Sequence, residues 1–388
     1  MRDFVFQNAT RIYFGRSRLD SLAGELSNYG KRVLLTYGGG SIKKIGLYDR
    51  IMDLLKENGF TVFEMGGIEP NPRHTSVNRG ARICKDEDID VVLAVGGGSV
   101  IDASKFICSG ALYDGDIWDL VKRKAPITGA LPLVSVLTLA ATGSEMDSGG
   151  VITNLETNEK IGGGHPSMFP KASFLDPTLT YTVSAYQTAC GSADILSHTM
   201  ETYFAREDGM YFLDTVMEGI MKTVIKYAPI ALQEPDNYEA RANLMWASSW
   251  AINGFVRADK PYPWSCHPME HELSAFYDIT HGLGLAILTP RWMRHVKNSD
   301  NISRFVKFGV NVFGIDPSLP DERIAELSIE KLEEFLFRTM GLTDNLTELG
   351  ITDEHFETMA ERVAGARPLA GFVDLKKEDV LAILKACL

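Results

Sequence analysis

Four histidines and one aspartate are the residues of this chain whose types and spacing best suit metal chemistry. His267, His271 and His281 fall within fifteen residues, although the whole chain has only eight histidines. Asp194 and His198 are four residues apart, a spacing that places both side chains on one face of a helix. One carboxylate and several imidazoles suit a borderline divalent ion such as Fe²⁺ or Zn²⁺. A core or surface histidine is the commoner interpretation of each residue alone, but their grouping favours a metal site.

One of the four histidines is expected to lie off the metal, because a site with one carboxylate has room for about three imidazole ligands. His271 lies one helical turn after His267, so it can face the same site without binding the ion. A histidine titrates near neutral pH and could therefore relay a proton. Cys266 could be a thiolate ligand, but no second cysteine lies nearby in the sequence, and a buried bystander is the better interpretation. Apolar walls of a substrate pocket could come from Trp264, Met269 and Phe255, although helix core is at least as good an interpretation for Phe255.

Two glycine-rich loops indicate a nucleotide. Gly38–Ser41 and Gly96–Ser99 each follow an apolar run typical of a buried strand, and a helical pattern begins at Val100. Backbone N–H groups converge at such a turn, and glycine lets a phosphate approach them closely. A tight turn that needs a positive φ is the alternative for one loop, but the repetition favours nucleotide binding. Neither loop matches the GxGxxG fingerprint or the P-loop, which argues against an ATPase.

A third loop, Ala141–Glu145, also follows a strand pattern, and ligands of open α/β sheets bind at such strand ends. Thr138 and Thr142 could give hydroxyl hydrogen bonds to a ring amide there. Asp102 could accept hydrogen bonds from ribose hydroxyls or amide N–H groups, or simply cap its helix. Lys160 could reach a phosphate or a ribose, and a solvated hairpin lysine is about as good an interpretation.

Strand and helix patterns alternate through the first half of the chain, which predicts a Rossmann-like, doubly wound parallel α/β sheet. From Ser184 onwards long helical periods dominate, so the second part is predicted to be all-helical. The boundary near Thr182 gives a dinucleotide-binding domain over residues 1–182 and a metal-binding, catalytic domain over residues 183–388. Strands are expected at Val5–Phe14 (as two short strands), Arg32–Tyr37, Thr61–Met65, Val91–Val95 and Leu131–Thr138, with a hairpin over Gly149–Asn154 and Lys160–Gly163.

Length and charge narrow the class of protein. With 388 residues, two domains are the default. The formal net charge of −12 argues against nucleic acid or an anionic membrane as a partner. No apolar run approaches the ~18–20 residues of a membrane span, and the N-terminus lacks the apolar segment of a secretion signal. Five scattered cysteines without CxxC spacing favour the reducing cytoplasm.

These residues resemble those of a known family over nearly the whole chain. The sequence is similar to the iron-containing (group III) alcohol dehydrogenases, and within them to the NADPH-dependent butanol dehydrogenase and aldehyde reductase branch. The resemblance implies a dehydroquinate synthase-like fold, metal ligands at Asp194, His198, His267 and His281, and a place near the nicotinamide for His271. The matching motifs include ATRIYFG, YGGGSIKK, LAVGGGSVIDASKF, LTLAATGSE, FLDPTLTYT, EPDNYEARANLMWA and CHPMEHELSAFYDITHGLGL.

The resemblance also assigns the cofactor contacts. It places the pyrophosphate at Gly97, Gly98 and Ser99, the nicotinamide end at Asp102, the nicotinamide ribose region at Thr138, Thr142 and Lys160, and the adenosine side at Asn71. NAD-preferring relatives carry an aspartate after the first strand of the sheet, where this chain has a turn containing Gly38, Gly39 and Ser41. Without a carboxylate to repel a 2′-phosphate, NADP(H) is expected in preference to NAD(H). Asp147 departs from the asparagine usual in the branch, and its charge would weaken cofactor binding or alter the preference if it faced the phosphates.

The expected reaction is reversible hydride transfer between NADP(H) and a primary alcohol or aldehyde such as butanol or butanal, with one divalent metal, Fe²⁺ or Zn²⁺, as Lewis acid. We expect a cytoplasmic homodimer. A glycerol dehydrogenase-like polyol oxidoreductase is the nearest alternative, and the Asp194 and His198 pair counts against it. A metal-dependent hydrolase and a nucleotide-sensing protein without catalysis are alternatives from other classes; NADPH binding would distinguish the hydrolase.

Overall fold

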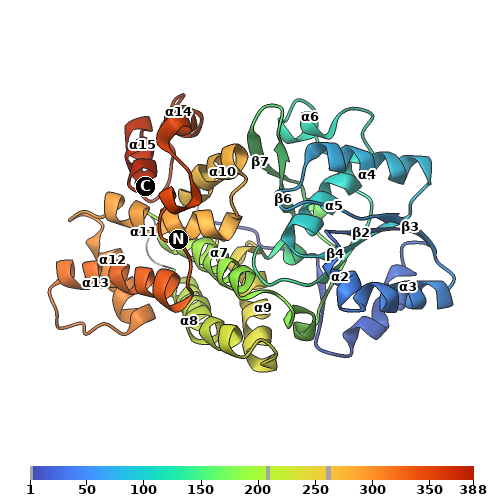
Figure 1. Ribbon diagram of the computed structural model, residues 1–388, viewed down its shortest axis with the longest axis horizontal. Coiled ribbons are helices and arrows are strands. Elements are labelled where there is room, and N and C mark those ends of the chain that lie inside the picture. Colours follow the sequence, from blue (N-terminus) through green and yellow to red (C-terminus); the bar gives the residue numbers. More distant parts are fainter. Residues whose placement is uncertain (1–2, 207–209, 259–263) are drawn as a thin grey trace. The chain divides into compact units, whose positions relative to one another are not determined.

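The computed structural model describes residues 3–206, 210–258 and 264–388 (Figure 1). These residues form two compact units. One unit is Gln7–Val183, and the other is Ser184–Leu388 together with the described residues before Gln7. Among the described residues, no helix is long and apolar enough to cross a membrane.

A six-stranded parallel sheet forms the centre of the Gln7–Val183 unit. Its middle strands are buried along nearly their whole length, which is why their sequences are continuous apolar runs rather than alternating patterns. A two-stranded antiparallel hairpin, β6 (Gly149–Asn154) and β7 (Glu159–Gly164), lies outside this sheet. The strand order is β1 (Arg11–Phe14), β8 (Ala172–Leu175), β5 (Leu133–Leu137), β4 (Val91–Gly96), β2 (Arg32–Tyr37) and β3 (Thr61–Met65).

Helices cover both faces of the sheet (Figure 1). Successive residues of a strand face opposite sides of the sheet. Val33 and Leu35 pack in the same core as α3, whereas Thr36, the residue after Leu35, bonds Ser104 of α5, with 2.7 Å between the hydroxyl oxygens. The α3 face is apolar at Leu47, Ile51 and Leu55, and burying each such side chain contributes about 1.5–3 kcal/mol. The helices are α1 (Leu22–Leu26), α2 (Ser41–Lys44), α3 (Leu47–Glu57), α4 (His74–Asp86), α5 (Gly98–Gly110) and α6 (Ile117–Val121).

The other unit is built from helices, with α7 (Ala185–Tyr203) in its core. Every residue of α7 from Thr188 to its end is buried, as expected for a helix that packs against α8, α9 and α11. The helices that follow α7 are α8 (Tyr211–Gln233), α9 (Tyr238–Ile252), α10 (Cys266–Tyr277), α11 (His281–Val296), α12 (Ile302–Phe313), α13 (Asp321–Glu333), α14 (Phe356–Ala364) and α15 (Lys377–Lys385).

The predicted fold class, a parallel α/β sheet followed by an all-helical part, is confirmed. Two details differ from the prediction. Of the two short strands expected in Val5–Phe14, only Arg11–Phe14 forms. Strand β8 was not predicted, because its four residues carry too short a pattern, and its pairing with β1 and β5 comes from distant parts of the chain.

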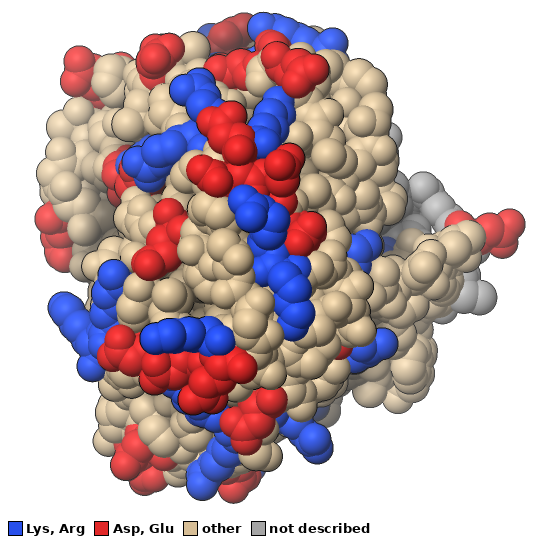
Figure 2. Space-filling view, turned by 90° about the vertical axis from the view of Figure 1, so that its right-hand side faces the viewer, with Lys and Arg blue, Asp and Glu red and all other residues tan. Residues whose placement is uncertain are grey.

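On the face shown in Figure 2, Lys and Arg side chains are intermixed with Asp and Glu side chains rather than gathered into a patch of one sign.

Candidate metal centre and cofactor loops

Helices α7, α10 and α11 bring the predicted aspartate and histidines together in the helical unit. Asp194 and His198 lie on α7, His267 is the second residue of α10, and His281 is the first residue of α11. One potential ligand atom from each of Asp194, His267 and His281 lies within 4.8 Å of the other two. Asp194 Oδ1 is 3.6 Å from His198 Nδ1, 3.9 Å from His267 Nε2 and 3.7 Å from His281 Nε2. Three histidines from three helices therefore converge on one carboxylate oxygen of Asp194.

This donor set fits a divalent metal ion. His198 Nδ1 and His267 Nε2 are both buried, and neither has a hydrogen-bond partner within the described part of the chain. An unsatisfied buried polar atom costs about 1–3 kcal/mol, and a cation at this point would take up both nitrogens. The two rings stack, with centroids 4.6 Å apart. A carboxylate with imidazoles is a donor set that iron and zinc both accept.

The protonation of the histidines reflects their surroundings. Burial lowers the pKa of His198 well below its ordinary value, and the neighbouring histidines lower it further. A neutral imidazole is the form that binds a metal. For His267, burial opposes the charged form, but the carboxylates of Glu201, Asp194 and Glu270 together outweigh burial and raise the pKa. His267 Nδ1 lies 2.5 Å from Glu201 Oε1, and His281 Nδ1 bonds Glu270 in the same way. Neither glutamate was predicted.

His271 lies beside the cluster. Its ring centroid is 5.8 Å from that of His281 and 6.3 Å from that of His267, and the side chain is partly exposed. Glu270, His271 and His281 form a second group with metal-ligand spacing, but it shares His281 with the first. The structure therefore places His271 within reach of the same centre.

The other residues singled out near this site have different surroundings. Trp264 places its ring 4.8 Å from that of His267, edge to face. Met269 is fully buried, and Phe255 belongs to an aromatic cluster with Phe6, Phe212 and Trp250. Cys266 is also fully buried, and burial raises the pKa of its thiol well above the ordinary value. Its thiol form fits the bystander interpretation.

In the α/β unit, the glycine loop after β4 touches the loop after β5. Helix α5 begins at Gly98, two residues earlier than predicted, with Gly97 as its N-cap. A Cβ on Gly98 would lie 2.3 Å from Thr142 Oγ1, so only glycine allows this approach. Thr138 joins the same group, because its N–H donates to Gly96 O at 3.0 Å. Gly97, Gly98, Ser99, Thr138 and Thr142 therefore lie together at the carboxyl ends of two neighbouring strands.

A buried lysine that was not predicted links α5 to the third loop. Lys105 is fully buried, and its Nζ donates to Ser144 Oγ at 2.9 Å, to Gly149 O at 2.6 Å and to the Asp147 carboxylate. The Lys105 ammonium group therefore forms an ion pair with the Asp147 carboxylate. Burial raises the pKa of Asp147 to about 6, and Lys105 opposes this shift. Asp102 accepts hydrogen bonds from Ser144 Oγ at 2.5 Å and from the Val151 N–H at 2.9 Å, so it also holds the loop and the hairpin.

The remaining predicted cofactor residues lie at two further places. Asn71 is buried with a φ of 50°, and Lys160 is buried on β7. The segment after Asn71 runs beside Thr153 of β6, whose partner across the hairpin is Lys160. Gly38, Gly39 and Ser41 form the turn between β2 and α2, with Gly39 and Ser41 exposed; Gly40 there has a φ of 100°.

Comparison with known proteins identifies the family of this chain. The iron-containing alcohol dehydrogenase model matches residues 9–177, and the model of the C-terminal part of the Fe-containing alcohol dehydrogenase family matches residues 188–388. The chain is 51% identical over 387 residues, 99% of both chains, to NADH-dependent butanol dehydrogenase A of Clostridium acetobutylicum. It is 36% identical to the NADPH-dependent aldehyde reductase YqhD of Escherichia coli, over 94% of this chain and 93% of that one.

A solved structure shows the same architecture. The crystal structure of NADH-dependent butanol dehydrogenase A from Thermotoga maritima matches with a TM-score of 0.94 and 39% identity, over 100% of this chain and 99% of that one. Both family models and relatives that span the chain agree. The chain therefore belongs to the iron-containing alcohol dehydrogenase family and is an oxidoreductase of alcohols and aldehydes.

Proposed function

We propose that the protein transfers hydride reversibly between a nicotinamide cofactor and a primary alcohol or aldehyde, such as butanol or butanal. One divalent metal, Fe²⁺ or Zn²⁺, would be held by Asp194, His198, His267 and His281. The observation that supports this most is a pair of buried nitrogens, His198 Nδ1 and His267 Nε2, that lie 3.6 Å and 3.9 Å from Asp194 Oδ1 and have no hydrogen-bond partner among the described residues.

The chain's own residues would divide the work as follows. When bound, the metal supplies Lewis-acid chemistry at the substrate oxygen, and the nicotinamide supplies or accepts the hydride. The carboxylate of Asp194 offsets part of the cation's charge, and the low pKa of His198 keeps that ring neutral. His271 would move the proton of the hydroxyl group to or from solvent, because it is partly exposed and lies beside His281. Trp264 would form an apolar wall beside His267.

Removal of the metal tests this proposal. Treatment with a strong chelator should abolish NADPH oxidation by butanal, and one equivalent of Fe²⁺ or Zn²⁺ should restore it. Asp194→Asn should lower metal affinity, because the anionic ligand becomes neutral. Full activity in protein shown to be free of metal would contradict the proposal.

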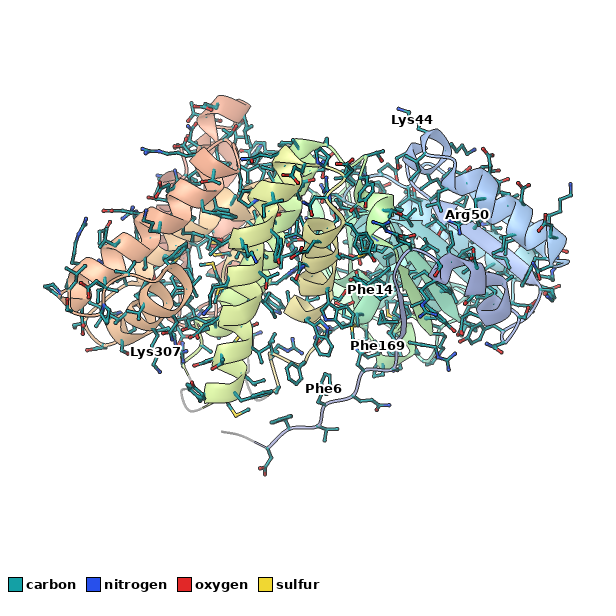
Figure 3. All side chains as sticks on the ribbon, turned by 90° about the horizontal axis from the view of Figure 1, so that it is seen from below. Phe6, Phe14, Lys44, Arg50, Phe169 and Lys307 are labelled. Carbon is teal, nitrogen blue, oxygen red and sulfur yellow. The ribbon has the colours of Figure 1, made fainter. Side chains whose placement is uncertain are left out.

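We also propose that NADP(H) is preferred to NAD(H). No carboxylate occurs in the Gly38–Ser41 turn, and Ser41 is exposed at the start of α2. Lys43 is held nearby, with its Nζ 5.0 Å from the ring centroid of Tyr37 and 4.4 Å from that of Tyr48, whereas Lys44 extends into solvent (Figure 3). Relatives at 51% and 50% identity are named NADH-dependent, and the relative at 36% is named NADPH-dependent, so kinetics must decide.

The kcat/KM ratio for NADPH against NADH tests this preference. A hydrogen bond to a charged group contributes about 1.5–3 kcal/mol, so Lys43→Met should lower the ratio roughly 10- to 100-fold if the lysine binds a 2′-phosphate. Lys44→Met is the matched control and should have a smaller effect. A wild-type preference for NADH would contradict the proposal.

Assembly and compartment are also proposals. All five cysteines are buried and free, which suits a reducing cytoplasm. We propose a homodimer, which light scattering would detect as a mass about twice the 42.9 kDa of one chain.

A further inference from the structure

Two buried glutamates contact His267 and His281 of the metal centre at Nδ1, the ring nitrogen that does not face Asp194. Glu201 is 1% exposed and Glu270 is 0% exposed, so each places a carboxylate inside the helical unit. Burying a carboxylate is unfavourable unless several donors satisfy it. The donors that surround these two groups include the Nδ1 atoms of His267 and His281.

Glu201 lies on α7, and its carboxylate accepts hydrogen bonds from the start of α10. Its Oε2 accepts the backbone N–H of Ser265, that of Cys266 at 2.7 Å and that of His267 at 3.4 Å. Ser265, the N-cap residue of α10, makes no side-chain cap of its own. The carboxylate therefore satisfies N–H groups that every helix leaves open at its start. Its other oxygen, Oε1, accepts from His267 Nδ1 at 2.5 Å and from Ser197 Oγ at 3.1 Å.

Glu270 repeats this arrangement one helix further on. It lies on α10, and its Oε2 bonds Nδ1 of His281 at the start of α11. Its Oε1 accepts from Ser274 Oγ. Gly284 of α11 leaves room for this side chain, since a Cβ there would lie 2.8 Å from Glu270 Cγ.

A repeated sequence motif underlies the two arrangements. His198–Glu201 reads His-Thr-Met-Glu and His267–Glu270 reads His-Pro-Met-Glu. In each, the histidine lies at the centre, and the glutamate three residues later bonds the next histidine of the centre, which lies on another helix. We propose that Glu201 and Glu270 are positioning residues that fix the tautomer and orientation of His267 and His281 for the metal. This inference rests on the proposed metal centre.

The physical reason is the chemistry of imidazole. An ionised carboxylate only accepts hydrogen bonds, so the Nδ1 that it binds must carry the proton. In a neutral ring, Nε2 then presents its lone pair. Both Nε2 atoms point toward Asp194, at 3.9 Å and 3.7 Å from its Oδ1. Loss of a hydrogen-bond partner behind a metal ligand typically lowers metal affinity about 10- to 100-fold.

The two glutamine substitutions should differ in severity. In Glu201→Gln, one oxygen cannot serve both the backbone N–H groups and His267. Either the amide NH₂ faces the helix start, or it faces His267 Nδ1 and forces the proton onto Nε2, where the metal would bind. In Glu270→Gln, the NH₂ can donate to Ser274 Oγ, whose hydroxyl can turn to Ile279 O at 3.2 Å. Glu201→Gln should therefore lower metal affinity more than Glu270→Gln.

Zinc titration of the metal-free, full-length protein tests the inference directly. The matched control is Glu272→Gln, which makes the same change on α10, the helix of Glu270; Glu272 pairs with Arg362 at 3.4 Å. We expect zinc affinity to fall about 10- to 100-fold in the two variants and to stay within about twofold of wild type in the control. Histidine ring ¹⁵N resonances of the zinc-loaded wild type, which has only eight histidines, should show a protonated Nδ1 on His267 and His281.

The outcomes separate the two proposals. If the wild type binds no zinc or iron, the metal centre itself is wrong, and this inference falls with it. If the wild type binds zinc and both glutamine variants bind it as tightly as the control, the metal centre stands and the positioning role is refuted. If Glu201→Gln does not fold, Glu270→Gln and the wild-type tautomers still decide the question.

Discussion

Three glycines within helices of the helical unit should respond in different ways to the same added methyl group. Gly282 and Gly284 follow the metal-facing His281 on α11, and Gly219 lies exposed on α8. A Cβ on Gly282 would lie 2.0 Å from the carbonyl oxygen of Cys190 on α7. A Cβ on Gly284 would meet the side chain of Glu270, whereas a Cβ on Gly219 would meet no atom of the described residues within 4 Å.

These distances set the magnitudes. Alanine is favoured over glycine inside a helix by about 0.8–1 kcal/mol, so Gly219→Ala should raise the free energy of unfolding by nearly that amount. Non-bonded atoms pack at about 3.5–4.0 Å, so Gly282→Ala must push α11 away from the α7 backbone. Overpacking of this kind lowers stability by about 1–3 kcal/mol or more. It should also move His281 away from Asp194. Gly284→Ala displaces Glu270 instead, so it should lower zinc affinity with a smaller loss of stability.

Urea unfolding followed by tryptophan fluorescence measures these effects. Four of the five tryptophans, at 246, 250, 264 and 292, lie in the helical unit, so the signal reports on it. We expect midpoints in the order Gly219→Ala, wild type, Gly284→Ala, Gly282→Ala, from highest to lowest. A midpoint for Gly282→Ala equal to that of Gly219→Ala would refute the close approach of α11 to α7.

Two further predictions concern charges in the α/β unit. Lys105→Met leaves the Asp147 carboxylate without its buried cation and should destabilise the protein by about 3 kcal/mol. Adding Asp147→Asn should restore part of this loss in the free energy of unfolding measured with urea. No restored stability would contradict the ion pair. Burial opposes ionisation of Glu25, but two tyrosine hydroxyls and an arginine outweigh it and lower its pKa below 4.5. That stabilisation is present above pH 4.5 and is lost as pH falls through the lower folded pKa. Glu25→Gln should therefore flatten the acid limb of the stability profile measured by circular dichroism, and an unchanged limb would contradict this assignment.

How much of the site the sequence could reveal depends on how local each contact is. Asp194 and His198 share one helix, so their spacing alone predicts a common face. The glycine loops likewise have their signal in a few adjacent residues. The fold class followed from alternating patterns, which each element carries by itself.

Contacts between distant elements could not be predicted in this way. Strand β8 has four residues, and only its pairing with β1 and β5 defines it. Glu201 acts on a histidine 66 residues later in the chain. A single glutamate in a helix gives no sign of such a partner, although the repeated His-x-Met-Glu motif was visible. Lys105 resembles any helix lysine until the fold encloses it with Asp147.

An anomalous difference map at the zinc edge, from crystals grown with zinc and NADPH, tests the central claim most directly. The proposed centre predicts one dominant peak per chain, within about 2.0–2.2 Å of ligand atoms from Asp194, His198, His267 and His281. His271 should lie outside that bonding distance, and Glu201 and Glu270 should stay on the Nδ1 atoms behind the ligands. A dominant peak on Glu270 and His271, or no peak beside Asp194, would contradict the account.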